Sequence, residues 1–564
     1  MQDTIACTGT NVHTYIMKLR KKFRCSIRKI LSPFNCCYNV NSNLSTLTKN
    51  AALESSEVAN KTLITKAVLE GKKTSNIAEM TKEEETLSTT PNSLKDIFKG
   101  THTIERMVIM SNYARAILGL PPCTDEQLEK FALLIYDSME APSRTFHNVE
   151  HLRDLSVGAV DAIQQSAIAF HDLIYYQIDG GLSDAQREYL HDIVVEKEDT
   201  TNEITTLKLE AAMEMVMDIF GFTYGQVLNP YKGMNEFLSA CVCVRSNLEM
   251  DRKRSPVRKM MSLTAKCAAC IEATIPFRTS DENGRYPPEA LFERLKKVNV
   301  TYDLQWDEEE TVKAVQRSVD LGNRDLDNFS WKDRGKFLTN TWKLLPESNV
   351  ALRTSVYYLS DLSLAMKKMA GFFEFLDPET LYFSFRDAKM EAMNKIKTTQ
   401  ARKNINTALH YMRHKLVALS VLSAIAELSG GDVPISLFVG DFATEGRPMS
   451  SHIEDFLDTD YLPSDDVDID HAVLKLLREG RSNSETSFDV NKSYLAALIY
   501  AHIGQRGMEE CLKYIVHPMD EAHSWLLLRN LPISLSHEIL SACSNLAITR
   551  RLEISEIVDK LRDE

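Results

Sequence analysis

The feature that most constrains the fold of this chain is a helical periodicity that recurs along most of its length. In Leu207–Phe220 and again over residues 401–428, apolar side chains return about every 3.6 residues, the repeat of an amphipathic helix. Only 21 Gly and 17 Pro occur among 564 residues, so few positions break such helices. The sequence therefore predicts an all-α protein, in which the short run Val433–Val439 is open to interpretation as a strand or an extended segment.

The stretch Arg144–Tyr176 carries the clearest chemical signal. His147 and His151 are four residues apart, so on a helix they would share one face. His171 and Asp172 form an adjacent pair at the end of an apolar run, with two tyrosines shortly after it. Imidazole beside carboxylate is a common grip for a divalent metal ion. A His-Asp pair arises often by chance, and the buried lead-in and the upstream histidines give this one its weight.

These motifs resemble those of the HD-domain superfamily of metal-dependent phosphohydrolases. The most similar subgroup opens one helix with Tyr-His-Asn-x-x-His and ends the next with Phe-His-Asp, and this chain has Phe146–His151 and Phe170–Asp172. In that subgroup a further Asp follows an Ala-Thr-x-x-His segment, in an Asp-x-Asp-Leu context. The corresponding segments here are Ala273–Arg278 and Asn323–Leu326, which match Asp325 to the fourth ligand. The resemblance covers roughly residues 100–345.

The resemblance implies an HD-domain-like orthogonal helical core with a large insertion, followed by an additional helical C-terminal region. It also implies one divalent ion, Mn, Mg, Zn or Fe, held by His151, His171, Asp172 and Asp325. The implied activity is hydrolysis of a phosphomonoester or phosphodiester, a nucleotide among the candidates. The expected partner is thus a small-molecule phosphoester, whose identity no motif in the sequence specifies.

Three residues are candidates for the catalytic steps. Asp172, while ligating, would also orient the attacking water, and His147 would contact the phosphate or act as a general acid. Arg278 has the planar guanidinium suited to phosphate charge in the transition state. A structural Arg–Glu pair is an equal alternative for Arg278, because Glu272 precedes it closely in the sequence.

Three departures from the subgroup pattern favour a second hypothesis. Asn323 stands where the pattern has its first Asp, Phe277 and Arg278 replace the expected His, and the interval between Asp172 and Asp325 is unusually long. The alternative is a non-catalytic binding or regulatory protein on a degenerate HD fold. In that case the helical C-terminal region would be the working surface.

The chain divides into four expected parts: a basic amphipathic leader over residues 1–40, a disordered linker over 41–95, the HD-like domain with its insertion over 96–400, and the helical C-terminal region over 401–564. The linker is rich in Ser, Thr, Asn, Lys and Glu and lacks aromatic residues. For the leader three interpretations stay open: a disordered basic tail, a helix over residues 12–31 lying on an anionic membrane surface, and an organelle presequence.

Charge and cysteine content narrow the possible binding partners and cellular locations of the protein. The net charge of −13 gives no general affinity for nucleic acid. Eleven irregularly spaced cysteines indicate a reducing, intracellular and most simply cytoplasmic setting. The longest apolar stretch, Leu416–Leu428, is too short to cross a bilayer. Four further cysteines could bind zinc, but we expect them to pack as small hydrophobic residues: Cys241, Cys243, Cys267 and Cys270.

A basic cluster and a second His-Asp pair complete the candidate features. The cluster, formed by residues 252–254 with Arg258 and Lys259, is expected to be a solvated helix end, with a phosphate-steering patch as the alternative. His191 and Asp192 lack an apolar lead-in, so a solvated helix is expected there instead of a site.

Overall fold

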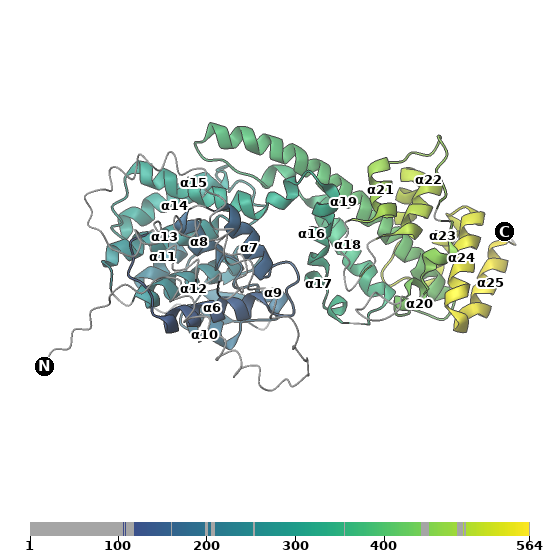
Figure 1. The fold of residues 1–564 in the computed structure, drawn as a ribbon, viewed down its shortest axis with the longest axis horizontal. Coiled ribbons are helices and arrows are strands. Elements are labelled where there is room, and N and C mark those ends of the chain that lie inside the picture. Colours follow the sequence, from purple (N-terminus) through teal and green to yellow (C-terminus); the bar gives the residue numbers. More distant parts are fainter. Residues whose placement is uncertain are drawn as a thin grey trace, which may run out of the picture.

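The computed structural model describes residues 105, 108, 115, 118–159, 161–197, 201–204, 209–251, 254–354, 356–440, 451–458, 460–481, 489 and 492–562. The leader and linker expected over residues 1–95 lie outside the described residues. The fold is all-α with one small sheet, and Figure 1 shows two helical bodies side by side along its long axis. We call them the first lobe and the second lobe.

The first lobe contains ten helices and three short strands that the structure describes. The helices are α6 (Asp125–Met139), α7 (Val149–Gly158), α8 (Ala162–Ile168), α9 (Tyr176–Asp179), α10 (Asp184–Leu190), α11 (Ala211–Phe220), α12 (Met234–Asp251), α13 (Val257–Glu272), α14 (Pro287–Thr301) and α15 (Glu308–Asp325). The strands β1 (Val194–Glu196), β2 (Asn202–Ile204) and β3 (Val227–Leu228) pair antiparallel in the order β1-β2-β3. This sheet occupies part of the segment where a solvated helix was expected.

The second lobe begins with the short 3-10 helix η3 (Asp327–Ser330) and continues through helices to the C-terminus. These are α16 (Arg334–Trp342), α17 (Leu344–Ser348), α18 (Leu359–Phe375), α19 (Ala388–Leu428), α20 (Ser436–Val439), α21 (His471–Glu479), α22 (Tyr494–Leu512), α23 (Glu521–Arg529), α24 (Ile533–Leu546) and α25 (Arg551–Arg562). The run Val433–Val439 is therefore mainly helical. Its extended character is limited to one bridge between Tyr358 and Pro434.

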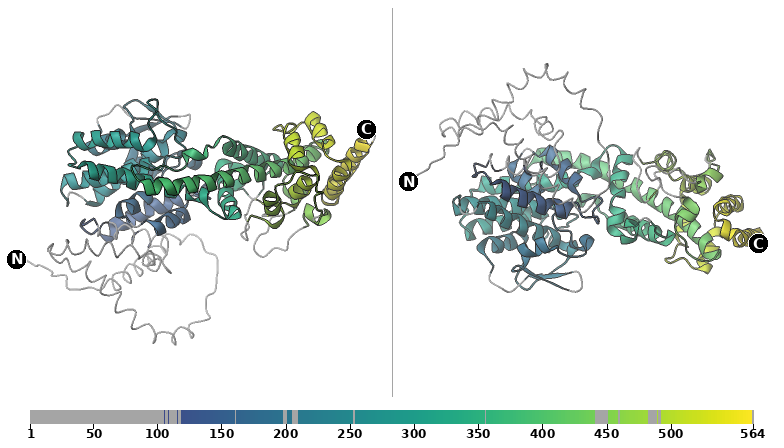
Figure 2. Two further views of the ribbon diagram at one scale, coloured as in Figure 1. Left: turned by 90° about the horizontal axis from the view of Figure 1, so that it is seen from above. Right: turned by 60° about the horizontal axis from the view of Figure 1, so that its bottom comes forward.

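The buried side chains form two cores, and the change from one to the other comes earlier than expected. The first core runs from Val108 to Leu321 and includes Phe385, whereas the second begins at Phe329. Residue 401, where the boundary was expected, lies inside α19, which contains neither Gly nor Pro and continues unbroken for 41 residues. At 1.5 Å per residue this helix is about 60 Å long, and both views in Figure 2 show it extending from one lobe into the other.

The long interval between the two metal-ligand motifs is part of the first core. It forms α9 to α14, the sheet and most of α15, and its buried side chains pack with those of α6 and α8. Cys241, Cys243, Cys267 and Cys270 are fully buried in this core. Burial raises the pKa of the Cys241 and Cys270 thiols, so both stay protonated and pack as small hydrophobic residues.

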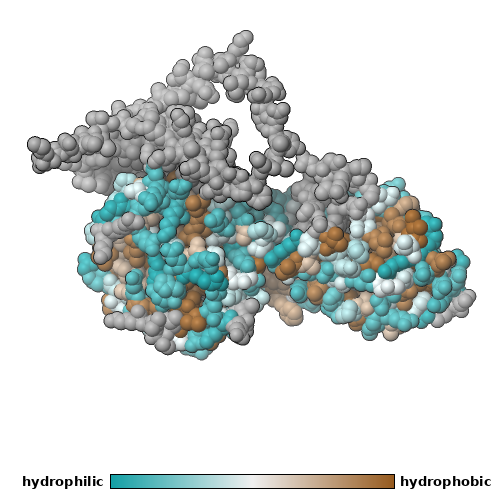
Figure 3. All heavy atoms as spheres, turned by 90° about the horizontal axis from the view of Figure 1, so that it is seen from below, coloured by the Kyte–Doolittle hydropathy of each residue, from teal (hydrophilic) through white to brown (hydrophobic). Residues whose placement is uncertain are grey.

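The surface carries no continuous apolar belt on the face drawn in Figure 3, where hydrophobic residues lie in separate patches among hydrophilic ones on both lobes. In the part of the chain that the structure describes, we find no helix with the combined length and hydrophobicity that crossing a membrane requires.

Candidate metal centre

The first histidine motif straddles the start of a helix. Asn148 caps α7, because its Oδ1 accepts hydrogen bonds from the backbone N–H groups of Glu150 (3.0 Å) and His151 (3.4 Å). His151 is thus in the first turn of α7, whereas His147 precedes the helix. The expectation that both histidines share one helical face is therefore wrong, because the asparagine between them ends the helical backbone geometry.

The second motif follows α8 through a tight turn. His171 is 1% exposed, and its Nδ1 lies 2.9 Å from the carbonyl oxygen of Ile168. Since a carbonyl only accepts hydrogen bonds, Nδ1 carries a hydrogen, which leaves Nε2 facing His151 and Asp172. The fourth side chain belongs to Asp325, the last residue of α15.

The structure brings these four side chains together. The two Nε2 atoms of His151 and His171 are 3.3 Å apart. Asp172 Oδ2 lies 3.0 Å from His171 Nε2 and 3.4 Å from His151 Nε2. Asp325 Oδ1 lies 3.0 Å from His151 Nε2 and 3.6 Å from His171 Nε2. Residues from α7, from the end of α8 and from α15 thus converge on one point, and we call them the His–Asp cluster.

Strong charge coupling accompanies this convergence. Burial by itself lowers the pKa of His151, but the neighbouring carboxylates of Asp172 and Asp325 outweigh it and raise that pKa to about 9. The pKa of His171 is raised for the same reason. Burial tends to raise the pKa of Asp325, yet the two imidazoles lower it to about 2. Two ionised carboxylates therefore face one point and attract positive charge, from protons or from a metal ion.

The four residues fit a divalent metal ion. Two ligand atoms at right angles, each about 2.1 Å from an ion, are about 3.0 Å apart, and the five separations above lie between 3.0 and 3.6 Å. Asp172 Oδ2 is buried yet makes no hydrogen bond of acceptable geometry within the described residues, so its contacts with the imidazoles are electrostatic. His151, His171 and Asp172 alone already offer three ligand atoms within 4.8 Å of one another.

His147 lies at the edge of this cluster and is fixed by the second lobe. Its Nδ1 is 2.7 Å from Oε2 of Glu347 on α17, and Oε1 of the same carboxylate accepts the backbone N–H groups of Phe146 (2.6 Å) and His147 (3.0 Å). Its ring also packs edge-on against Tyr175, with centroids 4.5 Å apart. Nothing in the sequence around Glu347 marks this contact, which joins residues 200 positions apart.

A second carboxyl group missed by the sequence analysis is Glu236 on α12. Burial raises its pKa to about 7, with further contributions from the charges of Asp172 and Asp325. Its Oε2 is buried without a hydrogen-bond partner in the described structure. The only signal that could have found it is an acidic residue placed just before the apolar stretch Phe237–Val244.

Arg278 forms the structural pair that the sequence left as one alternative. Its Nη1 donates to Oε1 of Glu272 at 2.6 Å, and Arg294 donates to the same oxygen. Glu272 is 1% exposed. The preceding Phe277 adopts a left-handed backbone with φ of 55° and packs against Phe372 of the second lobe. The Arg278 charge still acts on Glu236, whose pKa it lowers against the effect of burial.

The remaining candidate residues have structural roles. Asn323 lies in the first lobe and binds the backbone N–H and carbonyl of Phe383, at 2.9 and 2.8 Å. Asp192, of the second His-Asp pair, forms an ion pair with Arg245 at 2.7 Å. In the basic cluster the described side chains hold the ends of loops: Arg254 bonds to Pro122 O, Arg258 to Asp303 and Lys259 to Gly119 O.

No protein family, curated protein or solved structure matches this chain. The functional argument therefore depends on the geometry and chemistry of the His–Asp cluster.

Proposed function

We propose that the protein is a metal-dependent phosphohydrolase on an HD-domain-like helical core, acting on a phosphomonoester or phosphodiester. The observation that carries this proposal is the convergence of two imidazole nitrogens and two carboxylate oxygens at separations of 3.0–3.6 Å. The sequence interval between His171 and Asp325 exceeds 150 residues, so chance proximity of this ligand set is a poor explanation.

His151, His171, Asp172 and Asp325 would hold the ion. A divalent ion bound there would supply a Lewis acid that lowers the pKa of a water molecule and neutralises phosphate charge. The Asp172 side chain is 19% exposed, so one side of the cluster is open to solvent there. This exposure suits a role in orienting the attacking water. The buried His171 contributes fixed geometry, because the Ile168 carbonyl holds its ring.

His147 is the candidate general acid. Its Nδ1 is held by the Glu347 carboxylate, which fixes the ring and leaves Nε2 as the nitrogen that would donate a proton to the leaving oxygen. Because Glu347 also binds two backbone N–H groups, it fixes the segment as well as the ring. Arg278 is a second candidate for binding phosphate charge. If it turned toward a phosphate, Glu272 would still have Arg294 as a partner.

The test combines metal analysis with a substrate screen. Purified full-length protein should contain stoichiometric metal, or take it up from Mn²⁺, Mg²⁺ or Zn²⁺, and should hydrolyse some member of a phosphoester and nucleotide panel. Asp172→Ala should abolish metal binding and activity together, because one ligand and its charge are lost. Asp192→Ala is the matched control. It removes the Asp of the other His-Asp dipeptide, which pairs with Arg245, and it should alter neither metal binding nor activity.

The alternative, a non-catalytic binding or regulatory protein on a degenerate HD fold, makes the opposite prediction. Such a protein would bind no metal at the His–Asp cluster under any of these conditions. Failure of metal uptake by the unsubstituted protein would therefore reject the hydrolase and favour the alternative.

A further inference from the structure

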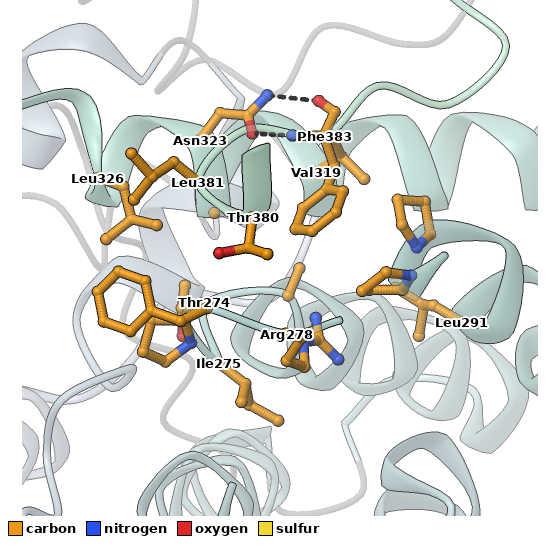
Figure 4. Close-up of a pocket in the computed structure, with 16 residues that line it drawn as sticks. Thr274, Ile275, Arg278, Leu291, Val319, Asn323, Leu326, Thr380, Leu381 and Phe383 are labelled. Carbon is orange, nitrogen blue, oxygen red and sulfur yellow. Dashed lines mark hydrogen bonds between the residues drawn. The ribbon is translucent and has the colours of Figure 1, made fainter. Parts of the chain in front are cut away.

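A pocket opens on the second lobe between α18, the C-terminal part of α19 and the loop that joins α22 to α23. Its volume is about 90 Å³. Because one water molecule needs about 10–15 Å³ of such space, the pocket has room for a ligand of several non-hydrogen atoms. The space beside Arg278 in Figure 4 is smaller, about 20 Å³, and would hold no more than about two waters.

Small side chains on two packed helices leave this space open. Ser360 and Ser363 are three residues apart on α18, so they lie on one face of that helix. On α19, Ser420, Ser423 and Glu427 follow at intervals of three and four residues and also share a face. The two faces meet where α18 packs against α19. We call this space, lined by the four serines, the serine pocket.

The serine pocket is acidic. Glu427 and Asp432 line it, and neither forms an ion pair within the described residues. Among the lining residues that the structure describes, none is Lys or Arg, and His517 is the one basic side chain. Ser423 donates its hydroxyl hydrogen to the carbonyl oxygen of Leu419 at 2.9 Å, so its oxygen can only accept from a ligand. The pocket therefore offers acceptors and negative charge, which suit a cationic hydrogen-bond donor.

A buried hydroxyl in the wall has no partner. Ser363 is 8% exposed, and its Oγ is buried without a hydrogen bond to any described residue. Buried polar groups in folded proteins are almost always hydrogen-bonded, because an unpaired one has lost its contacts with water. A ligand that hydrogen-bonds to the Ser363 hydroxyl would restore what burial removed.

The spacing of the side chains excludes a bare metal ion held by the titratable groups. In the part of the chain that the structure describes, only residues of the His–Asp cluster bring three such ligand atoms within 4.8 Å of one another, and Glu427, Asp432 and His517 do not. An organic cation can span a wider gap than an ion. We propose that the serine pocket binds a small primary amine, whose ammonium group contacts the two carboxylates and the serine hydroxyls. Its carbon chain packs against residues 516–519, which include Val516, Pro518 and Met519.

Butylamine and 1-butanol test this inference on full-length protein, because they are equal in size and differ in charge. In a ligand-observed NMR titration, butylamine should bind saturably and at least about 10-fold more tightly, the usual effect of a hydrogen bond to a charged group. Glu427→Gln should weaken butylamine binding about 10-fold or more, since one carboxylate charge is lost. Glu391→Gln is the matched control, because Glu391 lies on the same helix and pairs with Lys395 outside the pocket, so binding should not change.

Ser363→Ala separates ligand binding from folding. The Ser363 hydroxyl makes no hydrogen bond in the free protein, so the variant should melt at an unchanged or slightly higher temperature. It should nevertheless weaken butylamine binding by about 2- to 10-fold, as expected for one neutral hydrogen bond. The inference would be overturned by equal affinity for butylamine and 1-butanol, by no saturable butylamine binding, or by insensitivity to Glu427→Gln. These outcomes are independent of the hydrolase proposal, because no residue of the His–Asp cluster lines the serine pocket.

Discussion

Replacing Gly322 by Ala should disturb the metal centre from outside it. Gly322 lies where α15 crosses the end of α13, and a Cβ built on it would sit 2.4 Å from the carbonyl oxygen of Ala273. A carbon and a carbonyl oxygen normally approach no closer than about 3.3 Å, so the two helices would have to separate by about 1 Å. Overpacking of this kind costs about 1–3 kcal/mol of unfolding free energy.

The same displacement should reach Asp325, which is three residues further along α15 and ends the helix. A shifted ligand should weaken metal binding by about 10- to 100-fold, the range found when the support of a ligand is lost. The free energy of unfolding is measured by urea denaturation and the metal affinity by competition with a coloured chelator.

Gly371 in α18 provides the matched control. No atom lies within 4 Å of the position its Cβ would occupy, so Gly371→Ala should stabilise the protein by about 0.5–1 kcal/mol through helix propensity. The close approach of α13 and α15 would be refuted if Gly322→Ala proved as stable as Gly371→Ala and bound metal with unchanged affinity.

Three further predictions concern the cluster and its edge. Asp325→Asn should weaken metal binding measured by the same competition, whereas Asp327→Asn should be mild, because the partners of the Asp327 carboxylate are Lys397 and Ser330, outside the His–Asp cluster; equal effects would argue against the ligand assignment. In metal-free protein the raised pKa of His151 contributes stability that is complete below its unfolded value of about 6.5 and is lost as the pH rises through about 9. Thermal melting between pH 6 and 10 should show this decline, and a flat profile would contradict it. Glu347→Gln should leave metal content unchanged but reduce turnover about 10-fold or more, since a general acid loses its anionic partner; undiminished turnover would exclude the proposed role of His147.

Local signals in the sequence identified much of the fold. The start of α6 shows such a signal, because Thr124 and Gln127 form a reciprocal capping box there. Asn148 carried an equally local signal, yet the spacing of the two histidines suggested one continuous helix. Periodicity therefore located the helices, and capping residues decided where they begin.

Long-range contacts were beyond the sequence. The resemblance to the HD-domain motifs implied which four side chains should meet, but the partner of His147 comes from the other lobe and has no motif of its own. The boundary between the lobes was equally hidden, because α19 contains no Gly or Pro that would mark a break, while its side chains enter both cores. Met390 packs on the first core, and the residues from Ala401 onward pack in the second.

Because Glu347 holds His147 at the edge of the site, the order in which the chain is synthesised decides when the site becomes complete. The four side chains of the His–Asp cluster all emerge from the ribosome before residue 330, and they belong to a lobe whose core ends at Leu321. Glu347 emerges later and belongs to a core that extends to Leu561. The stretch from Glu347 to Leu561, which supplies most of the second core, is roughly 200 residues long and takes about 10–40 s to make at 5–20 residues per second. A nascent chain of this protein would thus hold its ligand set for that time before His147 is fixed, so metal capture would precede chemical competence.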